Sequence, residues 1–213
     1  MRLDVFTLVP HAFACLTEQR PVATVLGSEL DLRLFSYRDS TPLRAGQVDD
    51  EPYGGGAGMV LRVDVVAAAL DAAYGGKPEQ TVIALTPQGR QLTQPIVEEL
   101  AEREHVTLLS ARFEGFDDRI VQHLATDAIS VGPYVLSNGD LPAMILVDAI
   151  ARRLPGALSE GSGELESFSD ELGGGLEYPH YTRPAEFRGW RVPEVLLSGD
   201  HARIESWRKE HVR

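Results

Sequence analysis

Short runs of apolar residues alternate with polar loops along the first 155 residues of the chain. Period-two alternation and brief all-apolar runs predict strands at residues 3–9, 30–37, 81–85, 106–109 and 127–129. Apolar positions at helical spacing predict helices at residues 11–18, 63–74, 96–103, 117–123 and 141–154. Because strands and helices alternate, we predict an α/β fold with a mostly parallel sheet and helices on both faces. The loops after the later strands should gather at one edge of this sheet, where α/β proteins bind ligands.

The loop at residues 130–143 joins the last predicted strand to the last predicted helix and reads Ser-Val-Gly-Pro-Tyr-Val-Leu-Ser-Asn-Gly-Asp-Leu-Pro-Ala. Asp140 is expected to cap that helix, with Pro142 in its first turn, where the missing N–H is harmless. This concentration of turn residues suits either a ligand-binding loop or an ordinary tight connection. The residues alone favour neither.

A long polar connection at residues 38–60 contains three consecutive acids and a glycine-rich run, Asp49-Asp50-Glu51-Pro52-Tyr53-Gly54-Gly55-Gly56-Ala57-Gly58. Connections of this length are usually functional or disordered. The glycines would let the backbone approach a ligand closely, but no Gly-Lys-Ser/Thr follows, so this is not a phosphate-binding P-loop. The acids can be a metal pair, a general base or a solvated acidic run, and the solvated reading is the default.

The last quarter of the chain divides by charge. Residues 155–178 contain six acids, six glycines and no lysine or arginine, which predicts a flexible acidic linker or a mobile lid. Residues 179–213 contain seven lysines or arginines and five acids, which makes them the plausible phosphate-facing region. A strand-like pattern at residues 195–197 precedes a final helix predicted from about Asp200. We therefore expect three parts: an α/β domain at residues 1–157, a linker at 158–178 and a short helical C-terminal domain at 179–213.

The overall composition excludes several protein classes. A net charge of −12 argues against a generic nucleic-acid binder, so an RNA partner would need a local basic patch. The single cysteine, Cys15, excludes an internal disulfide and suits a reducing cytosol; we expect it to be buried in a helix. The sequence shows neither an apolar run of membrane length nor a basic-then-apolar leader, so we expect a cytoplasmic protein with no membrane partner.

Six short motifs, in the same order, resemble those of the bacterial tRNA (guanine-N1)-methyltransferases. They lie at residues 49–56, 86–90, 112–115, 132–137, 179–184 and 196–201 and span most of the chain. The resemblance implies a SPOUT-type α/β fold with a deep trefoil knot, and a homodimer whose active site lies at the subunit interface. It also implies S-adenosylmethionine as methyl donor and methylation of N1 of the guanosine 3′-adjacent to the anticodon, within the tRNA anticodon stem-loop.

Carried over position by position, the resemblance implies two sets of binding residues. The methyl donor would be held by three loops: Leu85, Thr86, Pro87 and Gln88; Ala111, Arg112, Glu114 and Gly115; and Val131, Gly132, Pro133, Tyr134, Val135, Leu136, Ser137 and Gly139. The substrate would be bound by Asp49, Asp50, Tyr53, Gly54, Gly55, Tyr181 and Arg183. In the family, the positions of Arg112 and Glu114 also line the guanosine side. Tyr181 has an alternative role in the packing of the C-terminal domain.

The resemblance also implies a catalytic base in the acidic segment. Alignment through Ser167 and Phe168 places Glu166 where the family has its catalytic Asp, and a shift along the chain would place Asp170 there instead. The base would remove the N1 proton of guanine, and Arg152 would stabilise the negative charge that develops toward O6. Without the resemblance, Arg152 would be interpreted as an ordinary partner of a helix-face acid.

The chain departs from the family pattern at several positions. Ala111 stands where the family has Gly, and Asn138 and Asp140 replace the usual Gly and Glu. Two alternatives therefore stay open: a knotted methyltransferase with another RNA target, and an inactive RNA-binding homologue. Acids at residues 49–51 and 164–171 offer oxygen ligands for Mg²⁺, but no rigid ligand spacing indicates a metal site.

Overall fold

Five segments form a parallel sheet whose inner strands are buried on both faces. The strands are β1 (Arg2–Thr7), β2 (Asp31–Ser36), β5 (Thr81–Gln91), β6 (His105–Ser110) and β7 (Asp127–Ser130), in the order β2-β1-β6-β5-β7. Every neighbouring pair is parallel; Val5, for example, lies opposite Leu34 on one side and Leu108 on the other. Runs of consecutive buried residues in β1 and β6 are typical of a sheet that is covered on both faces. The predicted mostly parallel α/β sheet is confirmed.

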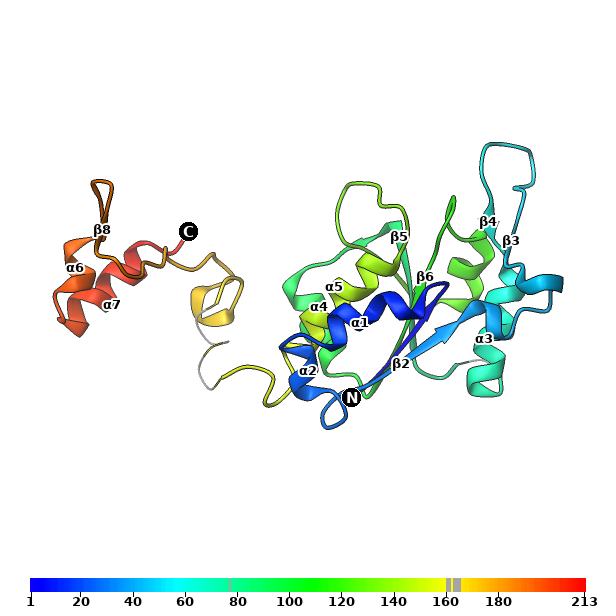
Figure 1. Ribbon diagram of the computed structural model, residues 1–213, viewed down its shortest axis with the longest axis horizontal. Helices are drawn as coiled ribbons and strands as arrows, with labels where there is room; N and C mark the ends of the chain where they lie inside the picture. The colour runs from blue at the N-terminus through cyan, green and yellow to red at the C-terminus, as the bar shows by residue number, and fades with distance from the viewer. Residues whose placement is uncertain (77, 160–161, 163–165) are drawn as a thin grey trace. The chain divides into compact units, whose positions relative to one another are not determined.

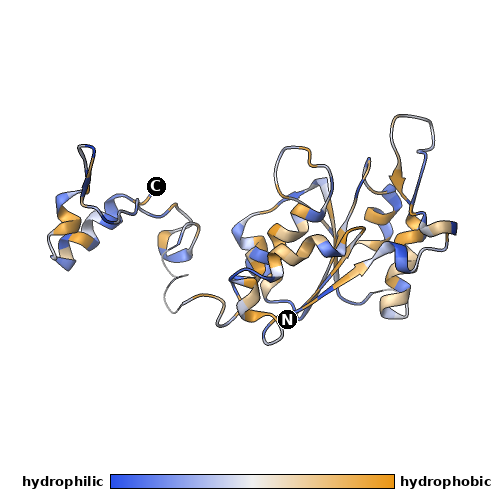
Figure 2. Ribbon diagram, viewed as in Figure 1, coloured by the Kyte–Doolittle hydropathy of each residue, from blue (hydrophilic) through white to orange (hydrophobic). Residues whose placement is uncertain are grey.

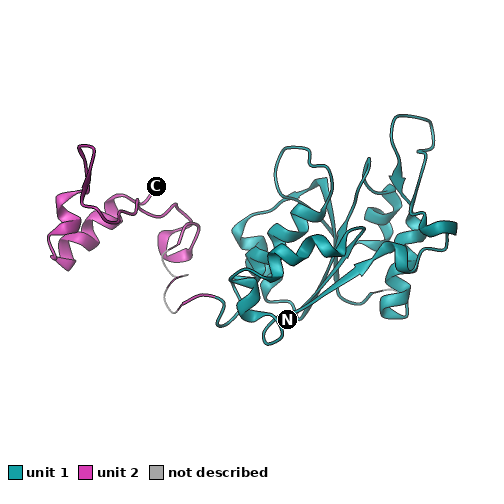
Figure 3. Ribbon diagram, in the orientation of Figure 1, with its two compact units in different colours: residues 1–157 teal, residues 158–213 magenta. Residues whose placement is uncertain are grey.

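The computed structural model describes residues 1–76, 78–159, 162 and 166–213. The chain divides into two compact units, Met1–Ala157 and Leu158–Arg213 (Figure 3). The sheet and the helices that cover it belong to the first unit. We describe each unit separately.

Helices lie on both sides of the sheet in the first unit (Figure 1). On one side are α3 (Val63–Tyr74) and the short π-helix η4 (Ile120–Leu124), and on the other are η1 (Pro10–Phe13), α1 (Ala14–Thr17), α2 (Val22–Val25), α4 (Gln94–Ala101) and α5 (Asp140–Ala151). Two further 3₁₀ turns, η2 (Tyr37–Asp39) and η3 (Arg44–Gly46), follow β2. Helix α5 packs against α4, β1 and β6, and Figure 2 shows that it is predominantly apolar.

The core on the α3 side explains why this helix forms where the sequence predicts it. Val66 and Leu70 of α3 pack with Phe6 of β1 and Leu109 of β6 in one buried cluster. Gly75 ends the helix in the left-handed region at φ 74°, with its N–H donating to the carbonyl of Asp71 at 2.7 Å. Burying four large apolar side chains stabilises the fold by roughly 1.5–3 kcal/mol each.

Strand β5 is longer than predicted because it contains an irregularity. Leu85 and Arg90 both pair with Ile129 of β7, so residues 86–89 bulge out of the sheet between them. Gly89 makes this possible: a Cβ there would lie 2.4 Å from the backbone of Ala128 and of Ile129, so only glycine allows the two strands to approach so closely. The bulge places Thr86 and its neighbours at the carboxyl edge of the sheet.

A small hairpin carries the glycine-rich segment. Strands β3 (Asp49–Asp50) and β4 (Val60–Leu61) are antiparallel, and the glycines form the connection between them. The hairpin is attached to the loop after β6, because Glu114 N–H donates to Met59 O at 2.9 Å and Leu61 N–H donates to Gly115 O at 3.0 Å. Gly58 adopts a positive φ of 82° at this contact, which favours glycine, and a Cβ there would displace the side chain of Glu114.

The second unit is small and contains little buried surface. Its elements are η5 (Asp170–Leu172), β8 (Glu186–Phe187), β9 (Trp190–Arg191), α6 (Glu194–Leu197) and α7 (His201–Glu210). Asp200 caps α7 by accepting a hydrogen bond from Arg203 N at 3.2 Å, as the predicted start of this helix requires. Figure 2 shows that α7 is largely hydrophilic, and none of its residues is buried. Leu176 and Arg213 exchange two backbone hydrogen bonds that join the start of the unit to its end.

Two local predictions are wrong. Cys15 lies in α1 but is exposed, because the buried side chain of this turn is Phe13 instead. Residues 195–197 belong to helix α6 rather than to a strand, since Pro193 starts a single helical turn there. The helix predicted at residues 117–123 is confirmed with a shift of one residue: residues 118–124 are helical, and the last five form the π-helix η4. Among the described residues, no helix is long and apolar enough to span a membrane.

Candidate functional site

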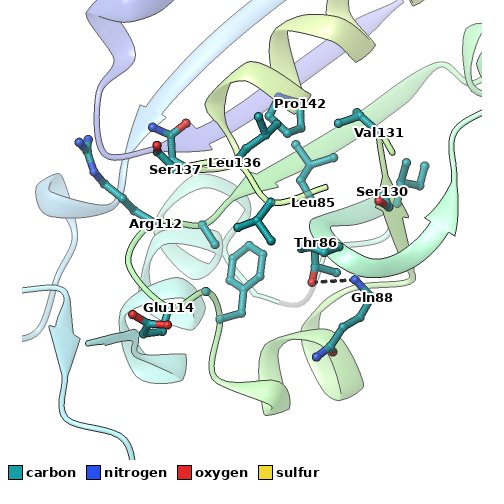
Figure 4. A pocket seen from close by; sticks show the side chains of 18 of the residues that line it. Leu85, Thr86, Gln88, Arg112, Glu114, Ser130, Val131, Leu136, Ser137 and Pro142 are labelled. Carbon is teal, nitrogen blue, oxygen red and sulfur yellow. Dashed lines mark hydrogen bonds between the residues drawn. The ribbon is translucent and has the colours of Figure 1, made fainter. Parts of the chain in front are cut away.

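A pocket of about 300 Å³ lies at the carboxyl ends of β5, β6 and β7 (Figure 4). Its walls are the three loops that follow these strands, which in a parallel sheet meet at one edge. In Figure 4 the apolar side chains of Leu85 and Leu136 lie centrally, with Arg112 and Glu114 toward one end and Gln88 toward the other. The pocket therefore combines apolar walls with a few charged and polar groups, as small-molecule sites do.

The structure brings together nearly all the residues that the sequence suggests for the methyl donor. Those that line the pocket are Leu85, Thr86, Pro87, Gln88, Ala111, Arg112, Glu114, Gly115, Val131, Gly132, Tyr134, Val135, Leu136, Ser137 and Gly139. Pro133 does not belong to this lining. Sequence reasoning missed Phe116, Asp118, Val121, Ile129, Ser130, Asn138 and Pro142, which also line it. No motif marked the side chains near η4, because only the fold turns that part of the chain toward the pocket.

Local hydrogen bonds shape the first and third loops. Thr86 Oγ1 accepts from Gln88 N at 3.4 Å in the bulge of β5. At the start of the third loop, Ser130 Oγ donates to Gly132 O at 3.0 Å. Tyr134 folds back so that its hydroxyl donates to Val131 O at 3.2 Å, and a Cβ on Gly132 would overlap its ring. The third loop is thus folded on itself beside the pocket.

The second and third loops touch directly at Gly139. Its N–H donates to Ala111 O at 2.7 Å, and a Cβ on Gly139 would lie 2.9 Å from Ala111 N and 3.0 Å from Ser110 Cα. Ala111 is buried and does not adopt a positive φ, so alanine fits at this position without backbone strain. Its neighbour Phe113 does adopt a positive φ of 62° and is partly exposed at the pocket edge. Such strain in a residue other than glycine is common at functional sites.

A buried carboxylate anchors the start of α5, directly after the third loop. The prediction that Asp140 caps α5 is wrong: Gly139 is the N-cap, and Asp140 is the first helical residue. Its side chain turns inward, where Oδ1 accepts from Thr7 Oγ1 at 2.5 Å and from Ser110 Oγ at 2.7 Å. These bonds tie α5 to the ends of β1 and β6. Burial and the nearby charge of Asp140 together raise the pKa of Tyr37 well above its ordinary value.

The residues expected to bind the guanosine lie outside the pocket lining. Asp49 and Asp50 form β3, and Asp50 Oδ2 pairs with Arg62 Nη1 at 2.8 Å. Tyr53, Gly54 and Gly55 lie in the glycine-rich connection of the same hairpin, where the side chain of Tyr53 is fully exposed. The hairpin nevertheless joins the pocket through the backbone bonds of Glu114 and Gly115 described above.

The candidate catalytic residues occupy both units. Arg152 is the C-cap residue of α5 and is partly buried, but it does not line the pocket. Asp170 begins η5 in the second unit, where it is exposed, and Glu166 lies four residues earlier. Between them Phe168 has a positive φ of 71°. The expected acids of this segment at positions 160 and 164 lie outside the described residues.

The remaining substrate candidates, Tyr181 and Arg183, also belong to the second unit. The ring of Tyr181 lies edge-on to Trp207 with centroids 6.3 Å apart, yet half of its side chain is exposed. It therefore has the contact expected of a packing residue as well as the exposure expected of a binding residue. In the described part of the chain, no group of three or more His, Cys, Asp or Glu side chains is arranged to hold a metal ion.

Comparisons with known proteins give a consistent result. The family model for "tRNA (Guanine-1)-methyltransferase TrmD" matches residues 1–213. Curated relatives named tRNA (guanine-N(1)-)-methyltransferase include those of Brevibacillus brevis and Geobacillus kaustophilus, 48% and 46% identical over 216 residues, which cover 100% of this chain and 87% of each relative. A relative of the same name from Dehalococcoides mccartyi is 44% identical over 213 residues, or 99% of this chain and 85% of its own. This chain belongs to the tRNA (guanine-1)-methyltransferase family.

Proposed function

We propose that this protein transfers the methyl group of S-adenosylmethionine to N1 of the guanosine on the 3′ side of the tRNA anticodon. One observation carries the proposal: the loops that hold three of the family motifs converge on a single pocket at the carboxyl edge of the sheet. Family membership and the printed names of the relatives support the same reaction.

The pocket residues fit the methyl donor chemically. Leu85, Val131 and Leu136 offer apolar surface to an adenine ring, and the loop backbones offer N–H and C=O groups to its polar edge. Arg112 and Glu114 offer opposite charges that suit the carboxylate and the ammonium group of the methionine part. When bound, S-adenosylmethionine supplies a methyl carbon attached to a positively charged sulfur.

The chemistry requires a base because guanine N1 carries a proton. In our proposal a carboxylate of the acidic segment, Glu166 or Asp170, accepts this proton while the N1 electron pair attacks the methyl carbon. The carbon–sulfur bond breaks with its electrons going to sulfur, which becomes a neutral thioether. Arg152 supplies positive charge for the negative charge that develops at O6. An unpaired anticodon-loop base can leave its stack at low cost, which makes N1 accessible.

Single-turnover methylation by three matched variants tests the base. We expect either Glu166→Gln or Asp170→Asn to slow methyl transfer by about 10²- to 10⁴-fold, because general-base assistance is worth about that much. Glu171→Gln is the control, since Glu171 is an exposed neighbour of Asp170 in η5. Wild-type rates in both test variants would overturn the assignment of the base to this segment.

The proposal includes the knotted SPOUT fold and a homodimer with a shared active site. Support for a dimer comes from Val135, Leu141 and Ile145, three large apolar side chains beside the pocket that are 87%, 56% and 43% exposed. The test uses mixed dimers in which one subunit carries a pocket substitution and the other carries Asp170→Asn or Glu166→Gln, each of which is strongly impaired on its own. If each site combines the pocket of one subunit with the base of the other, a mixed dimer has one site in which both parts are intact, and activity should return. If each site lies within one subunit, both sites of the mixed dimer carry a defect, and no activity should return.

Two further parts of the proposal concern location and metal. A cytoplasmic location follows from the tRNA substrate. We include a Mg²⁺ ion held jointly by carboxylates and by substrate oxygens, because Mg²⁺ is usually bound by one or two carboxylates together with substrate groups. Exposed acids of the first unit such as Asp50 and Glu51 are the candidate ligands.

A further inference from the structure

Residues 180–191 of the second unit are unusual in both exposure and composition. Every one of these twelve residues is exposed. The segment contains Tyr181, Phe187 and Trp190 together with three arginines, and it contains no Leu, Ile, Val or Met. Its three arginines and one glutamate give it positive charge within a chain whose net charge is −12. Aromatic and cationic side chains without aliphatic ones are a poor hydrophobic core but a suitable surface for nucleic acid.

Two exposed rings of the segment lie on one face of the hairpin β8–β9. Phe187 is paired directly with Trp190 and Glu186 with Arg191. Directly opposed residues point to the same side of a two-stranded ribbon, and the ring centroids of Phe187 and Trp190 are 5.9 Å apart at 59°. Trp190 is 69% exposed and Phe187 51% exposed. In the neighbouring opposed pair, Arg191 and Glu186 form an ion pair of 2.8 Å across the two strands.

The turn of this hairpin is built from residues that do not favour it. Arg188 and Gly189 have φ values of 53° and 84°. Two-residue turns with positive φ at both positions prefer Asn-Gly or Asp-Gly, so arginine is strained at the first position. Its guanidinium carbon lies 5.1 Å from the centroid of Phe187, which extends the ring surface with a cation. Backbone strain in a residue other than glycine is common at binding sites, and it supports a binding role for the Arg188 side chain.

We propose that this hairpin binds an unpaired nucleobase of the tRNA by stacking it against Trp190 and Phe187, while Arg188 contacts a phosphate. The proposal rests on the proposed function, because tRNA is the partner that this function supplies. Every base has a π-face, so such a platform needs no particular sequence. The stacked base is separate from the guanosine that is methylated, which must enter the donor site.

Substitution of the rings should weaken tRNA binding without altering the chemical step. Base–aromatic stacking is worth enough that Trp190→Ala should raise the Kd for tRNA by about 5- to 150-fold. Trp190→Phe should restore most of the affinity because it retains a ring. Leu197→Ala, which removes another exposed apolar side chain from the same unit, should leave Kd unchanged. Single-turnover rates at saturating tRNA should match the wild type in all three variants.

Salt dependence separates stacking from electrostatic attraction. Arg188→Asn keeps a residue that tolerates positive φ but removes the charge. It should reduce the slope of log Kd against log salt by about 0.7–0.9, as the loss of one phosphate contact requires. Trp190→Ala should instead weaken binding by the same factor at every salt concentration. Unstructured RNA should compete for the wild-type protein better than a duplex of equal length, because only unpaired bases can stack.

A fluorescence titration gives a direct readout that is independent of activity. The chain has two tryptophans, so Trp207→Phe leaves Trp190 as the reporter. Titration of the full chain with an anticodon stem-loop RNA should quench its emission. Unchanged emission in this titration would overturn the proposal, and so would an unchanged Kd for tRNA in Trp190→Ala. If Trp190→Ala changes the oligomeric state but not the RNA affinity, the hairpin contacts protein instead, and the proposal is also overturned. The proposed function fails differently: the wild-type protein would then bind RNA but leave guanine N1 unmethylated.

Discussion

Gly139 lies where the second and third loops of the pocket meet, and an alanine there would push them apart. The backbone itself would tolerate the change, because Gly139 has a φ of −84° and a ψ of 1°. The obstacle is steric. The new Cβ would lie 2.9 Å from Ala111 N, 3.0 Å from Ser110 Cα and 3.1 Å from Ser110 Oγ. Non-bonded carbon atoms prefer separations of about 3.5–4.0 Å, so the two loops must separate by roughly half an ångström or more.

The size of the effect follows from the cost of overpacking. Inserting a methyl group into a well-packed site typically costs about 1–3 kcal/mol. If the loops relieve this strain by separating, a donor that needs both loops must close them again, and its affinity falls by a similar free energy. A loss of about 1–3 kcal/mol corresponds to about 5- to 150-fold weaker binding. The fold should survive, because domains typically have a stability of about 5–15 kcal/mol.

Calorimetric titration with S-adenosylhomocysteine measures the effect of Gly139→Ala directly. Gly175→Ala is a matched control in the second unit, where a Cβ would be similarly crowded at 3.0 Å from Arg213 O and 3.1 Å from Leu172 O. We expect the control to bind the ligand as the wild type does. If Gly139→Ala is folded and binds with wild-type affinity, the contact between these loops does not shape the donor site, and this part of the reasoning is refuted.

Other substitutions and conditions test the surroundings of the site. Folding raises the pKa of Tyr37, so above about pH 10 this tyrosine ionises in the unfolded chain before it does in the folded one, and the free energy of unfolding falls as pH rises. Tyr37→Phe removes this group and should therefore make the free energy of unfolding less dependent on pH in the alkaline range. Urea denaturation at several pH values measures this, and an unchanged profile would contradict it. Ser110→Ala should lower the free energy of unfolding of the first unit by about 1.5–3 kcal/mol, because it removes a hydrogen-bond donor from the buried carboxylate of Asp140. A decrease of less than about 0.5 kcal/mol in the same urea assay would show that this bond contributes little. Chelation with EDTA should slow methyl transfer and added Mg²⁺ should restore it, whereas an unaffected rate would remove the metal from the proposed function.

The sequence was sufficient to predict the sheet and where its loops gather. Parallel strands buried on both faces leave uninterrupted apolar runs, as at residues 82–85, and α3 carries a clear helical pattern with glycine after its last residue. The alternation of strands and helices then determines which edge of the sheet receives the loops. The pocket at that edge therefore required little beyond pattern and topology.

Other features depended on tertiary contacts that no local pattern reveals. Asp140 resembles an N-cap in sequence, but Thr7 and Ser110, both far away in the chain, draw its carboxylate inward. The extension of β5 past Leu85 depends on Gly89 approaching a strand that comes nearly forty residues later. Helix α6 and the exposure of Cys15 were mispredicted because four-residue helices have too few positions for a periodic signal.

Methyl transfer to two tRNA transcripts that differ only in the nucleotide 3′ to the anticodon tests the central claim most directly. With labelled S-adenosylmethionine and mass spectrometry of the nucleosides, we predict one methyl group on N1 of that guanosine and none on the transcript that lacks it. Equal labelling of both transcripts, or a methyl group on a ribose or on another base, would contradict the account.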